Sequence, residues 1–211
     1  DPLINYFNQI TLEQRKDLRG YFGGGADTRF WRAFQKAISD ERDDFKPEGL
    51  DEYWADEAKT YNEESMRYIR SIELFVKALI ADQLEKVRGS NWLITGIPKP
   101  VYSRAKKEAD DQTYDIIAGG GSGEPVSIWD CVTLAECKDV ITNGRNWTDI
   151  FEPLFTRPEE EKIPGGKDAK TNWLARLSTI NNKLAKASYS VSTEEYNFIK
   201  SVYVWQCNGN K

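Results

Sequence analysis

Apolar residues recur at helical spacing over residues 64–88, and this long periodic run constrains the fold more than any other feature. It contains, three or four residues apart, Met66, Ile69, Ile72, Val76, Leu79, Ile80, Leu84 and Val87. Such spacing predicts an amphipathic helix with one wide apolar stripe, which other elements must cover. Gly89 follows the last turn, where a glycine commonly ends a helix.

Further segments supply helices that can cover this stripe. Apolar spacing predicts helices over 28–38, 101–111, 132–142, 146–155 and 168–187, and a short helix pair over 3–19. Ser192 followed by Glu195 is the pattern of a capping box and opens a last helix. Connections are expected over 44–49, 91–100, 119–123 and 157–167.

No segment alternates as a half-buried strand does, and the stretches that lean towards β structure, 126–129 and 201–205, are short. The sequence therefore predicts an all-α fold. Two parts are expected: an N-terminal helical segment over 1–43 and a helical domain over 44–211.

The composition indicates a soluble globular protein. Of the 211 residues, 39% are apolar and 30% are charged, and the net charge is -5. This balance argues against a protein that wraps duplex nucleic acid, since that task needs a strong positive field. No apolar run reaches the roughly 18 residues of a membrane span, so a cytoplasmic protein is expected. Because the chain starts at Asp1 without methionine, we expect it to be a piece of a longer protein.

The chain contains three cysteines and no histidine. The spacing of Cys131, Cys137 and Cys207 matches no zinc pattern, and without histidine a zinc site would need four thiolates or the help of carboxylates. The cysteines are therefore interpreted as reduced, buried thiols. No metal and no cofactor is expected.

The most suggestive motif lies on the helix expected over 168–187. Its residues are Asn181, Asn182, Lys183, Leu184, Ala185 and Lys186. This run resembles the Arg-Asn-x-x-x-His motif of HEPN domains with both catalytic positions changed. Before it come, in the order typical of such domains, a polar Ser-Ile-Glu-Leu-Phe centre in the long helix, a Trp-x-x-x-Gly-x-Pro turn, a Trp-Asp pair and an Asn-Trp-x-x-x-Phe helix. The succession covers most of 44–206 and resembles HEPN-like domains appended to DGQHR-domain proteins of prokaryotic mobile-element and phage-defence loci.

The resemblance implies a HEPN-like helical bundle with long loops and additional N-terminal helices. In intact family members it implies metal-independent RNA cleavage. The arginine and histidine lie near one face of the same helix, and two subunits bring their copies together across a dimer interface. Here Asn181 replaces the arginine, and it cannot neutralise a phosphate bidentately. Lys186 replaces the histidine, and a lysine with an ordinary pKa near ~10.4 is a poor base at neutral pH. Asn182 matches the position where an amide ties the helix to its neighbour.

The motif residues and Glu73 can also have purely structural roles. Asn181, Asn182, Lys183 and Lys186 are expected, first of all, to form the solvated side of their helix. Glu73 lies within the apolar stripe of the long helix, and pairing with Arg70 or Arg67 at helical spacing is the favoured interpretation. The alternative is that Glu73 reaches across to the helix of Asn181, where a vestigial site would then lie.

Two functions follow as hypotheses. The first is a catalytically degenerate HEPN-like module that forms a homodimer or docks on the remainder of a longer parent protein, with RNA or DNA nearby. Asn182, Lys183 and Arg70 are the candidate nucleic-acid contacts, and dispersed basic residues could gather beside aromatic rings. The second is a metal-independent ribonuclease that uses the vestigial candidates Asn181, Lys186 and Glu73.

Overall fold

The computed structural model describes residues 26–121, 123–156 and 166–208 of the chain. All regular elements in these ranges are helical and none is a strand, which confirms the all-α prediction. The helix pair expected over 3–19 and most of the connection expected over 157–167 lie outside the described residues. Within the described ranges, no helix combines the length and the apolar character needed to cross a membrane.

The chain forms two compact units that divide between Thr60 and Tyr61. The sequence places a boundary earlier, between residues 43 and 44. The first unit contains α3 (Ala26–Glu41), whose buried Ile38 packs with Trp31, Phe34 and Phe45.

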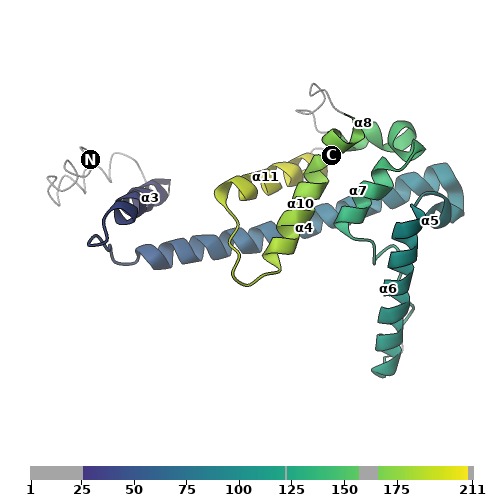
Figure 1. The fold of residues 1–211 in the computed structure, drawn as a ribbon, viewed down its shortest axis with the longest axis horizontal. Coiled ribbons are helices and arrows are strands. Elements are labelled where there is room, and N and C mark those ends of the chain that lie inside the picture. Colours follow the sequence, from purple (N-terminus) through teal and green to yellow (C-terminus); the bar gives the residue numbers. More distant parts are fainter. Residues whose placement is uncertain (1–25, 122, 157–165, 209–211) are drawn as a thin grey trace. The chain divides into compact units, whose positions relative to one another are not determined.

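Helix α4 (Leu50–Arg88) is the longest element, at 39 residues (Figure 1), and its part from Tyr61 onward belongs to the second unit. The predicted stripe is confirmed at its centre, where five residues are at most 1% exposed: Ile69, Ile72, Val76, Ile80 and Leu84. Met66 and Val87 are instead exposed at 47% and 54%, so the covered stripe is narrower than the spacing predicts. Gly89 ends the helix as predicted, with a left-handed φ of 69° that favours glycine.

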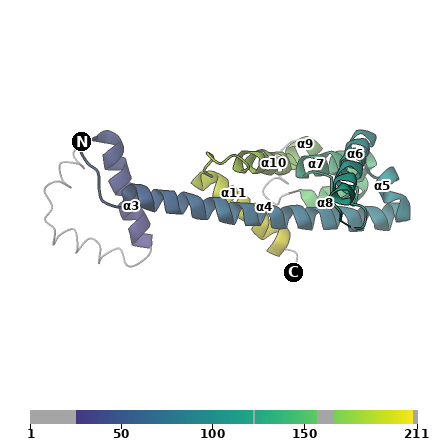
Figure 2. The same cartoon turned by 90° about the horizontal axis from the view of Figure 1, so that it is seen from below.

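The other helices of the second unit follow α4 in the chain, and several of them cover its stripe. In chain order they are η1 (Gly89–Asn91), α5 (Trp92–Thr95), α6 (Lys99–Ala118), α7 (Leu134–Thr142), η2 (Trp147–Phe151), α8 (Glu152–Phe155), α9 (Lys167–Lys170), α10 (Asn172–Leu184), α11 (Thr193–Tyr203) and η3 (Val204–Asn208). Helices α7 and α10 pack side by side, and α6 projects away from the rest of this unit (Figures 1 and 2). These three helices, together with α4, position the site described below.

Several predicted helices have different boundaries in the structure. The helix expected over 146–155 begins as the π-helical turn η2 and continues as α8, with Pro153 at the junction. A proline cannot donate to the carbonyl four residues earlier and clashes with it, and a wider turn relieves this conflict. The helix expected over 168–187 is interrupted at Thr171 and ends at Leu184.

Two capping boxes fix the starts of neighbouring helices. The predicted one is confirmed: the Ser192 hydroxyl accepts from the Glu195 amide, and the Glu195 carboxylate accepts from the Ser192 amide. The second box joins Thr133 to Glu136 at the start of α7. It holds the segment before α7 in place, and that segment forms part of the site.

Candidate functional site

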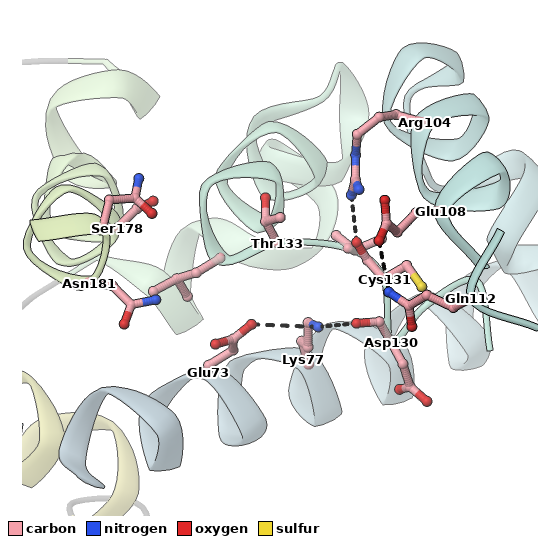
Figure 3. Close-up of a pocket in the computed structure, with 13 residues that line it drawn as sticks. Glu73, Lys77, Arg104, Glu108, Gln112, Asp130, Cys131, Thr133, Ser178 and Asn181 are labelled. Atoms are coloured by element: carbon pink, nitrogen blue, oxygen red, sulfur yellow. Dashed lines mark hydrogen bonds and ion pairs between the residues drawn. The ribbon is translucent and has the colours of Figure 1, made fainter. Parts of the chain in front are cut away.

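A polar groove of about 460 Å³ lies between α4, α6, α10 and the segment that enters α7 (Figure 3). Its lining residues are Glu73, Lys77, Arg104, Glu108, Gln112, Asp130, Cys131, Val132, Thr133, Leu134, Ser178, Asn181 and Asn182. Its volume is within the range of small-molecule and cofactor sites, about 300–1,000 Å³.

The floor of the groove is formed by one turn of α4. The Glu73 carboxylate lies 3.6 Å from Lys77 Nζ, and their side chains are 30% and 14% exposed. Lys77 Nζ also donates to the Asp130 carbonyl at 2.9 Å (Figure 3). The lysine therefore ties the segment before α7 down onto α4.

The favoured interpretation of Glu73, a pair with Arg70 or Arg67, is wrong. Its partner is Lys77, one turn later, because the covering segment places an acceptor carbonyl there. Arg67 and Arg70 are both exposed, and the Arg67 guanidinium lies over the Tyr68 ring instead. Glu73 lines the groove together with Asn181, as the alternative interpretation expected.

On the side of the groove opposite α4, the Arg104 guanidinium joins α6 to α7 and to the segment before α7. Arg104 Nε donates to Glu136 at 2.6 Å, Nη2 donates to the second oxygen of that carboxylate, and Nη2 also reaches the Cys131 carbonyl at 2.5 Å. Burial raises the pKa of Glu136, but hydrogen bonds from Arg104 and Thr133 outweigh it and hold that pKa below its usual range. Glu136 thus stays ionised at neutral pH and neutralises Arg104.

The thiol in the groove is poorly suited to nucleophilic chemistry. Burial, reinforced by Glu108, raises the pKa of Cys131 above its ordinary value. Since the thiolate is the reactive form, a raised pKa leaves Cys131 protonated at neutral pH. Cys137, fully buried behind it, has a pKa raised to about 12 by desolvation. Neither these two cysteines nor Cys207 forms a disulfide, and the described residues include no group of His, Cys, Asp or Glu arranged to hold a metal ion.

Helix α10 contributes the amide wall of the groove. Asn181 and Ser178 face it from one side, opposite Glu73 and Lys77 (Figure 3). The side-chain amides of Asn181 and Asn182 donate to and accept from no described residue, so both are available to a ligand. Each offers a donor pair and an acceptor.

The structure therefore brings together only some of the residues singled out from the sequence. Glu73, Asn181 and Asn182 share the groove. Lys186 lies exposed in the turn after α10, and it does not line the groove because α10 ends at Leu184. Lys183 faces Glu195 at 3.5 Å, on the side of α10 that meets α11.

Sequence reasoning missed the residues that shape the groove. Lys77 carried one usable signal, its spacing of four residues from Glu73. Arg104, Glu108 and Ser178 carried none, because only the packing of α6 and α10 around α4 brings them to one place.

No protein-family model, curated protein or solved structure matched this chain when compared with it. The HEPN resemblance therefore stays a prediction.

Proposed function

We propose that the second unit is a non-catalytic protein-interaction module whose groove binds an extended segment of a partner polypeptide, one that presents a cationic side chain. The partner segment belongs to another protein or to the remainder of a longer parent chain. If the HEPN resemblance holds, that parent is a prokaryotic defence or mobile-element protein. The groove then corresponds to the ribonuclease active site of the family, which has lost its catalytic residues and binds a partner instead.

The charge of the groove supports this proposal more than any other observation. Arg104 is neutralised by Glu136, which leaves the carboxylates of Glu73 and Glu108 against the single ammonium of Lys77 among the described lining residues. A concave site with this excess of acid attracts a cation and repels a phosphate. Recognition of RNA at this groove is therefore disfavoured.

The amide wall supports a polypeptide ligand in particular. A peptide backbone presents alternating N–H donors and C=O acceptors, and the side chains of Asn181 and Asn182 offer the matching groups. Ser178 adds a hydroxyl on the same helix. Backbone contacts of this kind bind an extended segment, while the carboxylates of Glu73 and Glu108 bind its cationic side chain.

A random linear peptide library displayed on phage tests the proposal. Peptides selected on the wild-type chain are expected to be enriched in lysine or arginine. They are expected to bind the Glu73→Gln, Asn181→Leu double variant at least about tenfold more weakly, which corresponds to about 1.4 kcal/mol. Both substitutions keep the approximate side-chain volume.

The matched control is Glu85→Gln, Asn197→Leu, which makes the same chemical changes at exposed positions of α4 and α11 outside the groove. It is expected to bind the selected peptides as the wild type does. Failure to enrich any peptide, or equal binding by the groove variant and the control, would contradict the proposal.

A metal-independent ribonuclease is the second candidate function. The observation that favours it is that Glu73 and Asn181 line one groove, so a carboxylate and an amide could face an RNA 2′-hydroxyl and a phosphate. Against it stand the acidity of the groove and the position of Lys186 outside it. This candidate requires RNA cleavage without metal that depends on these residues.

A further inference from the structure

One side of α4 in the second unit is left uncovered by the helices that pack against its buried stripe. Four exposed residues lie along this side: Arg67, Leu74, Ala78 and Glu85. Leu74 is 62% exposed, although it is a large apolar residue in the middle of the helix. Helices α7 and α10 lie in front of α4 in Figure 1 and leave this side open. These four residues form the outer face of α4.

The spacing of the outer face follows the helical period. Its members are 7, 4 and 7 residues apart, which keeps them on one side of a helix with about 3.6 residues per turn. Arg67 and Glu85 are 18 residues apart, so about five complete turns separate them and they lie in line, about 27 Å apart along the axis. The face therefore has a cation at one end, a carboxylate at the other and an apolar centre.

Both terminal charges of the outer face are available to a partner. Lys86, the neighbour of Glu85, is paired with Asp82 at 2.7 Å. The Arg67 guanidinium lies over the Tyr68 ring. Among the described residues, neither Arg67 nor Glu85 has an oppositely charged side chain within ion-pair distance.

We propose that the outer face pairs with the same face of a second copy of this chain, in antiparallel orientation. A pair centred at the level of Val76 places residue 67 opposite residue 85 and residue 74 opposite residue 78, because the members of each pair are equally far from the centre. Arg67 of each copy then meets Glu85 of the other, and Leu74 packs against the small Ala78. A parallel pair would instead place like charges opposite each other, so the complementarity of charge fixes both the partner and its direction.

The acids that precede Arg67 do not oppose this pairing. In the same register, Glu63 and Glu64 lie at the level of Gly89 and Arg88 of the second copy. Neither of these is an acid, so the two glutamates meet no like charge at that level.

This pairing goes beyond the groove and does not depend on it, because no residue of the outer face lines the groove. A dimer carries two grooves, and a partner that presents two segments binds it more tightly than it binds a monomer. One pair of helices in contact over about 27 Å buries less area than the roughly 1,200 Å² of a standard complex, so we expect a reversible dimer.

Sedimentation equilibrium of the whole chain at about 100 µM, well above a micromolar dissociation constant, tests the proposal. The wild type is expected to have an average mass above that of the monomer. Arg67→Glu and Glu85→Arg are each expected to associate at least about tenfold more weakly, because each change puts like charges opposite each other at both ends of the pair. An equimolar mixture of the two variants is expected to associate as the wild type does, because both contacts between unlike variants join opposite charges.

The matched controls are Lys107→Glu and Asp111→Arg, which reverse the same charges at exposed positions of α6. Each is expected to associate as the wild type does, and so is the groove variant Glu73→Gln, Asn181→Leu, which separates this test from that of the groove. Recovery in the mixture also shows that both outer-face variants are folded. A monomeric wild type, equal association of Arg67→Glu and its control, or a mixture that stays monomeric would each overturn the proposal.

Discussion

Replacing Asn146 with alanine is expected to lower the free energy of unfolding by about 3 kcal/mol, because several buried hydrogen bonds are lost together. Asn146 is 2% exposed. Its Nδ2 donates to the Gly96 carbonyl at 2.7 Å and to the Val140 carbonyl at 3.0 Å, and its Oδ1 accepts from Arg88 Nη2 at 3.3 Å. One side chain thus joins the end of α4, the turn after α5 and α7.

The substitution leaves buried acceptors and a guanidinium without partners, and this cost exceeds that of the missing atoms. Urea denaturation followed by circular dichroism measures the change. Asn197→Ala, at an exposed position on α11, is expected to change stability by less than about 0.5 kcal/mol. A loss below about 1 kcal/mol for Asn146→Ala would show that water replaces these bonds, contrary to the packing described.

Trp173→Ala is expected to destabilise the second unit by about 3–5 kcal/mol, the usual cost of removing a large buried aromatic side chain. Trp173 is 2% exposed, and its Nε1 donates to the Phe155 carbonyl at 3.1 Å. Its ring packs against those of Phe155 and Trp205, at 6.3 Å and 5.2 Å. It therefore joins α10 to both π-helical regions, η2 with α8 on one side and η3 on the other.

Thermal and urea unfolding measure this loss, with Tyr114→Ala as the control. Tyr114 is also a large aromatic residue, but it is 71% exposed near the end of α6, so its removal is expected to cost less than about 0.5 kcal/mol. If both variants unfold at the same denaturant concentration, Trp173 does not occupy the centre of a packed core.

The helices that cover α4 were predictable because their apolar residues repeat with the helical period. The centre of the long helix and the capping box at Ser192 follow directly from such local patterns. The first turns of α4 did not follow, because residues 51–63 are mostly polar and carry no stripe. The π-helical turn before Pro153 and the break at Thr171 were not predicted either, because the apolar spacing runs unbroken through both positions and gives no sign of a local change in the helix.

The groove was predictable only in part. Glu73 and Asn181 could be paired as a hypothesis, because the resemblance relates the long helix to the later motif. The ion pair between Arg104 and Glu136 could not be predicted. These residues come from α6 and α7, and their pairing depends on how the two helices pack. Arg70 was wrong as the partner of Glu73 because its place on α4 is exposed, outside the covered stripe.

Cleavage of labelled single-stranded RNA by the purified chain, with a chelator present, tests most directly whether the groove binds or cuts. The wild type and the Glu73→Gln, Asn181→Ala, Lys186→Ala variant are expected to give the same background level of cleavage, because the chain has no histidine and its groove repels phosphate. Reproducible metal-free cleavage by the wild type that disappears in this variant would contradict a non-catalytic groove and would establish the ribonuclease instead.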